Sequence, residues 1–199
     1  MTDLSKALRQ QLEAEHPLCA PAVVDKQISR DGTRKYLLRF DDGCLVETVG
    51  IPSSDNRLTV CFSTQVGCPM GCVFCATGKE GFTRNLVIGE IIDQVLVVQN
   101  DFGKRVTNLV GMGQGEPFLN YDAVIGALDI INSKKGLNIG ARKITLSTCG
   151  IIKGILPGEG TIHSGHLAAC RAPGSARSNH APRVLPTAFP TERGSEGLS

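Results

Sequence analysis

The sequence predicts an α/β fold in which a largely parallel sheet is flanked by helices. Two observations support this prediction: strand-like and helix-like segments alternate between residues 89 and 147, and a glycine-rich loop, 111–117, follows one of those strands. Parallel strands that are joined through helices place the loops after their carboxyl ends at one edge of the sheet, where functional sites form. We therefore expect the site at that edge.

The first elements of the chain are an expected helix and an expected β-hairpin. Segment 3–15 has apolar residues at helical spacing, and Pro17 ends the helix. Segments 33–40 and 44–49 are rich in β-branched, aromatic and leucine residues and flank an Asp-Asp-Gly turn, which predicts a hairpin.

Two helices and three short strands complete the expected core. The first of these helices buries one face, which is formed by Ile91, Ile92, Val95, Leu96 and Val98. In chain order we expect a polar loop at 51–57, a strand at 58–63, a helix at 89–101, a strand at 106–110, a helix at 121–132 and a strand at 143–147.

Composition and charge exclude several classes of protein. The chain has 199 residues, of which 41% are hydrophobic and 20% are charged, as in an ordinary folded protein. Its net charge of +2 argues against a strongly basic nucleic-acid coat protein. Polar residues break its longest apolar runs and its start has no secretory signal pattern, so we expect no membrane span and a cytoplasmic or organellar protein.

The character of the sequence changes beyond residue 153. Residues 154–199 contain seven glycines, five prolines and no lysine, whereas the first 153 residues contain all nine lysines. No useful periodicity continues there, so little apolar surface is available to offset the entropy of ordering the backbone. We expect a disordered tail. A natural extension is one explanation, and we favour a truncation or a shifted reading frame, because three βα units cannot close a barrel.

Cysteines are the most informative feature of the sequence. In a chain without a secretory signal, eight cysteines indicate reduced thiols, metal ligands or catalysts and not a disulfide framework. Cys68, Cys72 and Cys75 form a C-x3-C-x2-C run. Three thiolates on one loop can ligate three irons of a [4Fe–4S] cluster and leave the fourth iron open for chemistry.

Two other metal sites are alternatives for this cysteine run. A structural zinc site needs four ligands, commonly two C-x2-C pairs, and Cys61 would have to be the fourth ligand at an unusual spacing. A ferredoxin-type electron carrier would close its cluster with a fourth cysteine. We therefore favour a cluster with an open iron.

The cysteine run and its surroundings resemble the radical S-adenosylmethionine (SAM) superfamily, and more specifically the RNA adenine-C2 methyltransferases of ribosomal and transfer RNA. Five strings carry this resemblance in family order: VETV at 46–49, CFSTQVGC at 61–68, GFTRNL at 81–86, MGQGEPFLN at 112–120 and RKITLST at 142–148. The resemblance implies a partial (β/α) barrel of the radical SAM type.

The resemblance also implies which residues bind the cofactors. Cys68, Cys72 and Cys75 match the ligands of the [4Fe–4S] cluster, whose open iron binds SAM in such enzymes. The pair Gly115 and Glu116 matches the loop that holds the methionine end of SAM, and a carboxylate is a suitable acceptor for its ammonium group. Ser147 matches a further contact to SAM.

Two catalytic residues follow from the same resemblance. In the family, one SAM methylates a cysteine on a C-terminal loop, and a second SAM gives a 5′-deoxyadenosyl radical that activates this methyl group for addition to C2 of adenine. Glu47 matches the acceptor of the C2 proton. Cys61 matches the cysteine that helps to release the product by thiol–disulfide exchange.

The implied partners are ribosomal RNA, transfer RNA and a flavodoxin-like electron donor, and we expect a monomer without a membrane partner. Exposed basic residues are candidates for contacts with RNA phosphates. They are Lys79, Arg84, Lys104, Arg105, Arg142 and Lys143.

The sequence departs from the family pattern soon after Ser147. The methyl-carrying cysteine should lie beyond residue 199, and the surroundings of Cys170 do not match it. We expect an N-terminal extension at 1–57, the first half of a radical SAM core at 58–153 and an irregular tail at 154–199. The chain is therefore expected to bind a cluster without completing methyl transfer alone. A non-catalytic Fe–S fragment and a radical SAM enzyme with another substrate are the alternatives.

Overall fold

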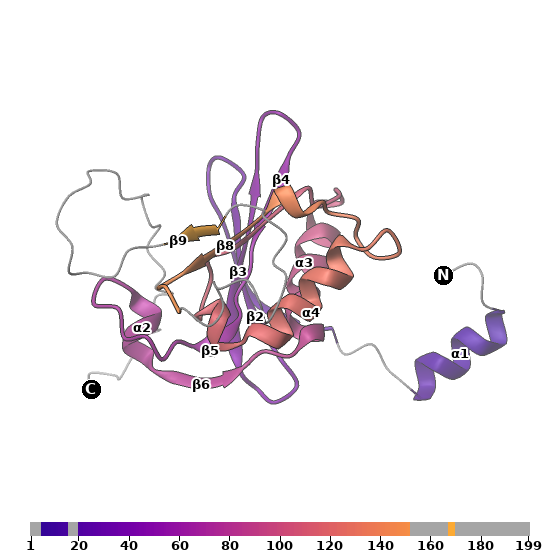
Figure 1. Ribbon diagram of the computed structural model, residues 1–199. Helices are drawn as coiled ribbons and strands as arrows, with labels where there is room; N and C mark the ends of the chain where they lie inside the picture. Colours follow the sequence, from indigo (N-terminus) through magenta and orange to yellow (C-terminus); the bar gives the residue numbers. More distant parts are fainter. Residues whose placement is uncertain (1–4, 16–19, 152–166, 170–199) are drawn as a thin grey trace, which may run out of the picture.

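A single mixed sheet runs through most of this computed structural model, which describes residues 5–15, 20–151 and 167–169 (Figure 1). The order of its seven strands is β1-β2-β3-β4-β7-β8-β9. Neighbouring strands are antiparallel from β1 to β4 and parallel from β4 to β9. The strands are β1 (Ala22–Ile28), β2 (Arg34–Arg39), β3 (Leu45–Pro52), β4 (Leu58–Cys61), β7 (Asn108–Gly111), β8 (Ile144–Thr148) and β9 (Leu167–Ala169).

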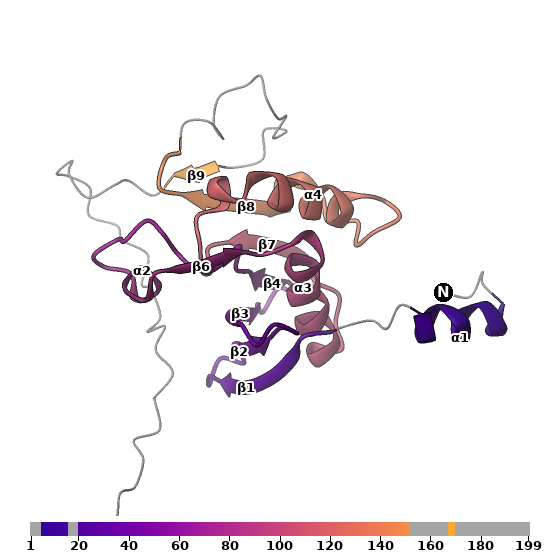
Figure 2. The ribbon, with the colours of Figure 1, turned by 90° about the horizontal axis from the view of Figure 1, so that it is seen from below.

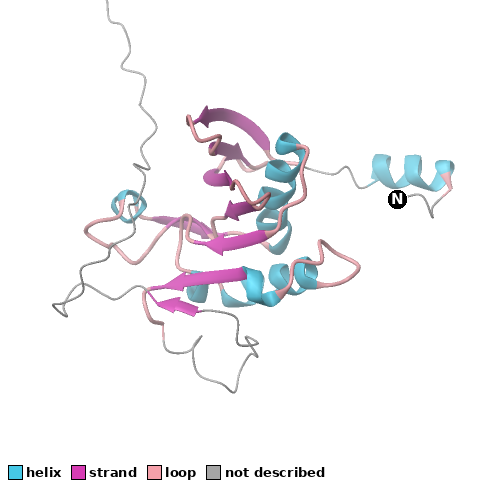
Figure 3. Cartoon of the chain, turned by 90° about the horizontal axis from the view of Figure 1, so that it is seen from above, coloured by secondary structure: helices cyan, strands magenta, loops and turns pink. Residues whose placement is uncertain are grey.

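Two helices cover one face of this sheet. Helix α3 (Ile88–Phe102) precedes β7, and helix α4 (Tyr121–Asn132) lies between β7 and β8. Figures 2 and 3 show both helices on the same side of the strands. Two short 3-10 turns, η1 (Pro117–Leu119) and η2 (Ala141–Lys143), flank α4, and α1 (Lys6–Glu15) lies away from the sheet.

The sequence of α3 explains why it packs closely on the sheet. Ile91, Val95 and Val98 are fully buried, as the predicted apolar stripe requires. A Cβ atom on Gly50 of β3 would lie 2.7 Å from Val98 Cγ1 and 2.6 Å from a ring carbon of Phe102. Because glycine has no Cβ, the helix approaches the strand at a distance that no other residue permits there.

Polar contacts fix the carboxyl end of α3 against the antiparallel strands. The Asp101 carboxylate accepts hydrogen bonds from Lys26 Nζ at 2.9 Å, Arg34 Nη1 at 2.7 Å and the Tyr36 hydroxyl at 2.8 Å. The Arg34 guanidinium also lies 4.0 Å from the centre of the Phe102 ring. One carboxylate thereby connects β1 and β2 to α3.

A second, smaller sheet brackets the cysteine run. Strands β5 (Gln65–Gly67) and β6 (Phe82–Asn85) are antiparallel, and helix α2 (Ala76–Glu80) lies between them in the chain. The Cys68 amide donates to the Gly81 carbonyl at 2.7 Å, which closes the base of the loop. The three cysteines of the run are therefore presented on a loop whose two ends are hydrogen-bonded to each other.

The structure confirms the predicted fold class, the hairpin and both core helices, and α4 has the predicted bounds. Strand β3 extends to Pro52, into the predicted polar loop, because Ile51 and Pro52 pair with Thr59 and Leu58. Strands β1, β5 and β6, helix α2 and strand β9 are additional. The predicted disordered tail at 154–199 lies outside the described residues, with the exception of β9. No helix in the described ranges is long and apolar enough to cross a membrane.

Candidate functional site

The face of the sheet opposite α3 and α4 carries the two residues that the sequence assigned to catalysis. Val49 pairs with Lys35 on one side and with Cys61 on the other, so these three residues form a row across β2, β3 and β4. Glu47 is two positions from Val49, and alternate residues of a strand point to the same face. The intervening Thr48 is fully buried. Glu47, Cys61 and Lys35 therefore share the face that α3 and α4 leave uncovered.

The edge of the sheet where β4, β7 and β8 end is built from three loops that are bonded to one another. The Ser63 hydroxyl donates to the Glu47 carbonyl at 2.6 Å and accepts from the Gln114 amide at 3.0 Å. The Gly113 amide donates to the Phe62 carbonyl at 3.1 Å. These bonds bring the loop after β7 against the loop after β4, next to Glu47.

Three buried amide side chains hold the loop after β4 in place. Gln94 of α3 accepts from the Ser63 amide at 2.8 Å and donates to the Ser63 carbonyl at 3.0 Å. Asn120 donates to the carbonyls of Thr64 and Leu86, each at 2.8 Å. Gln65 accepts from the Glu116 amide at 2.8 Å. Because buried polar groups are costly when unpaired, these complementary bonds define one loop conformation.

Glu116 connects the loop after β7 to the end of β8. Its side chain is 2% exposed. One carboxylate oxygen accepts from the Thr148 hydroxyl at 2.6 Å and the Phe118 amide at 3.1 Å, and the other accepts from the Cys149 amide at 2.6 Å. The preceding Gly115 has a φ of +101°, and a Cβ there would lie 2.6 Å from the Gln65 side chain. This position requires glycine.

The loop after β7 has the features of a site for a polar ligand. The side-chain oxygen of Gln114, Oε1, is buried and has no hydrogen-bond partner among the described residues. Such an atom is rare in native proteins and calls for a donor. Gly113 and Gly115 leave no side chain between this loop and the loop after β4. A ligand with ammonium or amino donors, such as the methionine end of SAM, fits this set of acceptors.

The three cysteines of the run lie on the loop between β5 and α2, and all three thiols are half-buried. The Cys75 amide donates to the Cys72 carbonyl at 3.0 Å, which folds the C-x2-C segment into a turn. Burial raises the pKa of Cys68, and the nearby thiols of Cys72 and Cys75 raise it further. In the described ranges no three His, Cys, Asp or Glu side chains form a preassembled metal site. The donor set nevertheless fits an iron–sulfur cluster, because three thiols on one short loop are the ligand type that such a cluster takes.

A fourth thiol lies at the same place. Cys149 Sγ is 3.7 Å from Cys72 Sγ, although the two residues are 77 positions apart. Burial raises the pKa of Cys149 to about 12, and the contact with Cys72 contributes in the same direction. The sequence analysis did not select Cys149, Thr148 or Gln114. A signal was available in the sequence, because all three residues lie in segments that follow the carboxyl ends of predicted parallel strands, where functional sites form.

The two predicted catalytic groups have distinct electrostatic surroundings. Burial raises the pKa of Glu47, and a hydrogen bond from Lys35 Nζ at 3.2 Å opposes this rise. Burial also raises the pKa of Cys61 to about 11, against a smaller opposing effect of the Met112 amide. At neutral pH, Cys61 is therefore a protonated thiol.

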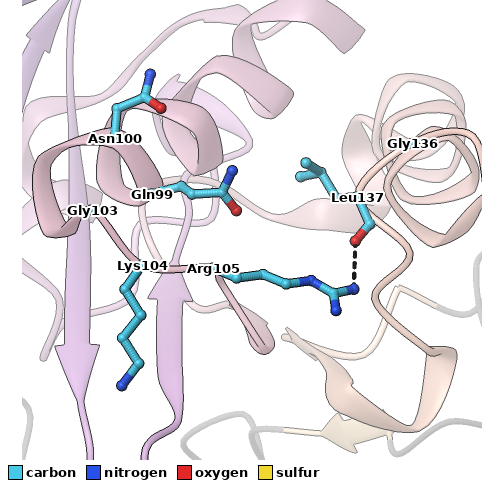
Figure 4. Close-up of a pocket in the computed structure, with 7 residues that line it drawn as sticks. All are labelled: Gln99, Asn100, Gly103, Lys104, Arg105, Gly136 and Leu137. Atoms are coloured by element: carbon cyan, nitrogen blue, oxygen red, sulfur yellow. Dashed lines mark hydrogen bonds between the residues drawn. The ribbon is translucent and has the colours of Figure 1, made fainter.

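A shallow hollow lies at the opposite end of the sheet (Figure 4). Its lining comes from the segments that precede β7 and β8, and it includes Lys104 and Arg105. The Arg105 guanidinium donates to the carbonyls of Leu137 and Asn138. Arg84 is likewise bonded to Asp42 and Glu90. Two of the basic residues proposed for RNA contacts thus have structural partners.

The sequence and the fold of this chain resemble those of known proteins. Residues 62–156 match the family described as the radical SAM superfamily. Residues 62–156 therefore resemble a radical SAM domain. A radical SAM methyltransferase from Sphaerobacter thermophilus has the same fold, with a TM-score of 0.74 and 42% identity over 84% of this chain and 50% of that one. The match confirms the partial α/β fold of the radical SAM type.

Curated relatives of this radical SAM domain are named RNA methyltransferases. The dual-specificity RNA methyltransferase RlmN of Oleidesulfovibrio alaskensis is 51% identical over 156 residues, which cover 76% of this chain and 44% of that protein. The probable dual-specificity RNA methyltransferase RlmN of Gloeobacter violaceus is 54% identical over 151 residues, which cover 76% and 42%. The chain spans less than half the length of these relatives. The resemblance inferred from the five strings is confirmed.

The structure brings most of the predicted site residues to one edge of the radical SAM domain. The cysteine run and Glu116 are linked through Cys149, whose amide donates to the Glu116 carboxylate at 2.6 Å and whose Sγ lies 3.7 Å from Cys72 Sγ. Ser147 is half-buried on β8, on the same face as Cys61, because Cys61 and Thr145 both pair with Val110 of β7.

Proposed function

We propose that this chain supplies the radical SAM part of an RNA methyltransferase that acts on C2 of adenine in ribosomal RNA and transfer RNA. One observation carries the proposal: the cysteine run, the loop with Gly115 and Glu116, and the face with Glu47 and Cys61 meet at one edge of the sheet. The names of the relatives, which are dual-specificity RNA methyltransferases, support the class of substrate.

The proposed cofactor site combines two loops. Cys68, Cys72 and Cys75 would ligate a [4Fe–4S] cluster, and Gly115, Glu116 and Ser147 would hold SAM beside it. When bound, the cluster and SAM supply the methyl group and the radical chemistry, with an electron from a flavodoxin-like donor. The unpaired Gln114 oxygen, the carboxylate of Glu116 and the glycine backbone are the acceptors that this chain offers to the ammonium group.

The proposed catalytic groups act on the RNA side of the site. The Glu47 carboxylate accepts the proton that leaves adenine C2. The Cys61 thiol takes part in product release by thiol–disulfide exchange, which requires its thiolate. Because burial raises the pKa of Cys61 to about 11, this step needs a local base to remove the proton.

We propose the cytoplasm or an organelle as the compartment of this protein. We propose that it acts as a monomer.

Anaerobic reconstitution with iron and sulfide tests the cofactor site. The chain should become brown and bind about four irons, and it should release 5′-deoxyadenosine from SAM when a reductant is added. Cys72→Ser should lose the colour and the iron. Cys44→Ser is the matched control, because Cys44 is also half-buried but lies in the hairpin turn. A colourless protein that holds one zinc ion contradicts the proposal, and a brown protein that never cleaves SAM supports only an Fe–S binding fragment.

RNA dependence tests the substrate class. Release of 5′-deoxyadenosine should increase when ribosomal RNA fragments or transfer RNA containing an unpaired adenine are added. The matched control is the same RNA with that adenine replaced by uridine. Equal stimulation by both RNAs, or stimulation by a peptide alone, would favour a radical SAM enzyme with another substrate.

A further inference from the structure

We infer that Lys35 is a positioning residue that keeps the Glu47 carboxylate ionised and aimed along the face of the sheet opposite α3 and α4. The inference rests on the proposed role of Glu47 as a proton acceptor. It starts from an ion pair between neighbouring strands, in which Lys35 Nζ lies 3.2 Å from Glu47 Oε1.

The register explains how Lys35 reaches Glu47. Leu37 of β2 is directly opposite Glu47 of β3, and Lys35 is opposite Val49. Lys35 and Glu47 are therefore diagonal neighbours on one face, a separation that a long side chain spans. Because the partner residue is two positions away along the strand, the lysine stem lies along the sheet and draws the carboxylate toward the row that contains Cys61.

Burial distinguishes this ion pair from the others in the described part of the chain. The Lys35 and Glu47 side chains are 15% and 12% exposed. Both values are lower than those of either partner in the other ion pairs, where exposure ranges from 16% to 56%. Exposed ion pairs contribute little, whereas a shielded charge acts strongly on the protonation of its partner.

The charged groups around Glu47 have opposing effects. Burial raises the pKa of Glu47, Lys35 on β2 lowers it, and Glu80 on α2 raises it. On β4, Cys61 is a neutral thiol at neutral pH, since burial raises its pKa to about 11. Lys35 is the cationic group that counteracts burial. Without it, Glu47 would hold its proton at higher pH, so that a smaller fraction of the carboxyl group would be ionised and able to accept a proton.

Carbon-13 NMR titration of the Glu47 carboxyl group tests this inference on the chain itself. The Glu47 signal is assigned as the one that Glu47→Gln removes. Lys35→Met should shift the titration midpoint of Glu47 upward, and Lys35→Arg should leave it close to that of the unmodified chain. Lys104→Met is the matched control, because Lys104 lies at the opposite end of the sheet. Glu80→Gln should shift the midpoint downward, which checks the sign independently.

Two results would overturn the inference. One is a Lys35→Met midpoint that moves no further than that of Lys104→Met. The other is a Lys35→Arg midpoint that moves as far as that of Lys35→Met, since charge would then be irrelevant. If amide spectra show that Lys35→Met does not fold, Lys35→Gln replaces it and the arginine and Glu80 variants are judged by the same criteria. The titration needs neither cluster nor RNA, so a negative result does not contradict the proposed function. Likewise, a colourless protein after reconstitution would not contradict the role of the ion pair.

Discussion

At the scale of single residues, the site depends on atoms that only tertiary folding brings together. The Cys72 and Cys149 thiols, 3.7 Å apart, are the clearest case. A disulfide requires the two sulfur atoms to approach further, to about 2.0 Å, and both cysteines are half-buried and unbridged. Occupation of Cys72 by a metal would withdraw it from this reaction.

This contact predicts a selective cross-link in the protein before iron is added. Two equivalents of thiol exchange with one oxidised glutathione, which gives a Cys72–Cys149 disulfide and two reduced glutathione molecules. Tryptic digestion without reductant should then yield peptide 58–79 joined to peptide 144–153, detected by mass spectrometry. Cys72→Ser should abolish this product, and Cys44→Ser should not. Equal cross-linking of Cys149 to Cys68 and Cys75 would contradict the observed geometry.

The conformation of Gly115 gives a second prediction at this scale. Gly115→Ala should lower the free energy of unfolding by about 2 kcal/mol, because an L side chain is strained at its φ and would also strike Gln65 and Thr64. Gly43→Ala is the matched control, since its φ of +83° is equally left-handed but nothing lies within 4 Å of the new Cβ. Urea denaturation of both variants is the measurement. Equal losses would show that the close approach of the two loops contributes nothing.

At the scale of elements, the contact of α3 with β1 and β2 depends on one carboxylate. Partial burial raises the pKa of Asp101, but hydrogen bonds from Lys26, Arg34 and Tyr36 outweigh it and lower the pKa from 3.8 to about 2. The folded state therefore binds this proton more weakly than the unfolded state. The resulting stability is present above the unfolded pKa and is lost as the pH falls from about 4 to about 2.

Asp101→Asn should remove this contribution. We expect a loss of about 2 kcal/mol near neutral pH, because two cations lose their acceptor, and a flatter dependence of stability on pH below 4. The measurement is chemical denaturation at a series of pH values. Asp129→Asn, on the exposed surface of α4, is the matched control and should change little. If the stability of Asp101→Asn depended on pH below 4 as that of the unmodified chain does, the Asp101 carboxylate would not be the group that connects α3 to β1 and β2.

The sequence predicted the elements whose own pattern determines them. Helix α4 and the β2–β3 hairpin have strong periodicity or a clear turn, and both were located correctly. Strand β1 has all seven residues exposed, so it lacks the alternation that marks a half-buried strand. Strands β5 and β9 have three residues each and exist through their partners, β6 and β8. In the site, Glu116 was expected because its loop resembles the family pattern, whereas Lys35 and Cys149 depend on register and on contacts between distant segments.

At the scale of the whole molecule, stability is distributed unevenly across the sheet. Strand β3 has partners on both sides and is covered by α3, whereas β1 is an exposed edge strand. Local opening is easiest where few apolar contacts cover the backbone hydrogen bonds. The cysteine loop is supported by the short β5–β6 pair.

Hydrogen–deuterium exchange should reveal this gradient. Amides of β1 should exchange at least about tenfold faster than those of β3, a difference of about 1.4 kcal/mol in the free energy of opening. Reconstitution with iron and sulfide should slow exchange at residues 68–80 and leave β1 unchanged, which makes β1 the internal control. Slower exchange throughout the chain on metal addition would instead indicate that the metal binds a non-specific set of thiols.

The Glu116 carboxylate connects two segments that are distant in the sequence, the loop after β7 and the turn after β8. Each of its oxygens already receives a donor from its own chain, and the donors come from Thr148, Phe118 and Cys149. In the proposed SAM site, an incoming ammonium group would either share an oxygen with these donors or displace one of them. Exchange of the Cys149 amide for a ligand donor would release the turn after β8, so arrival of the small molecule would be communicated directly to the thiol that faces Cys72.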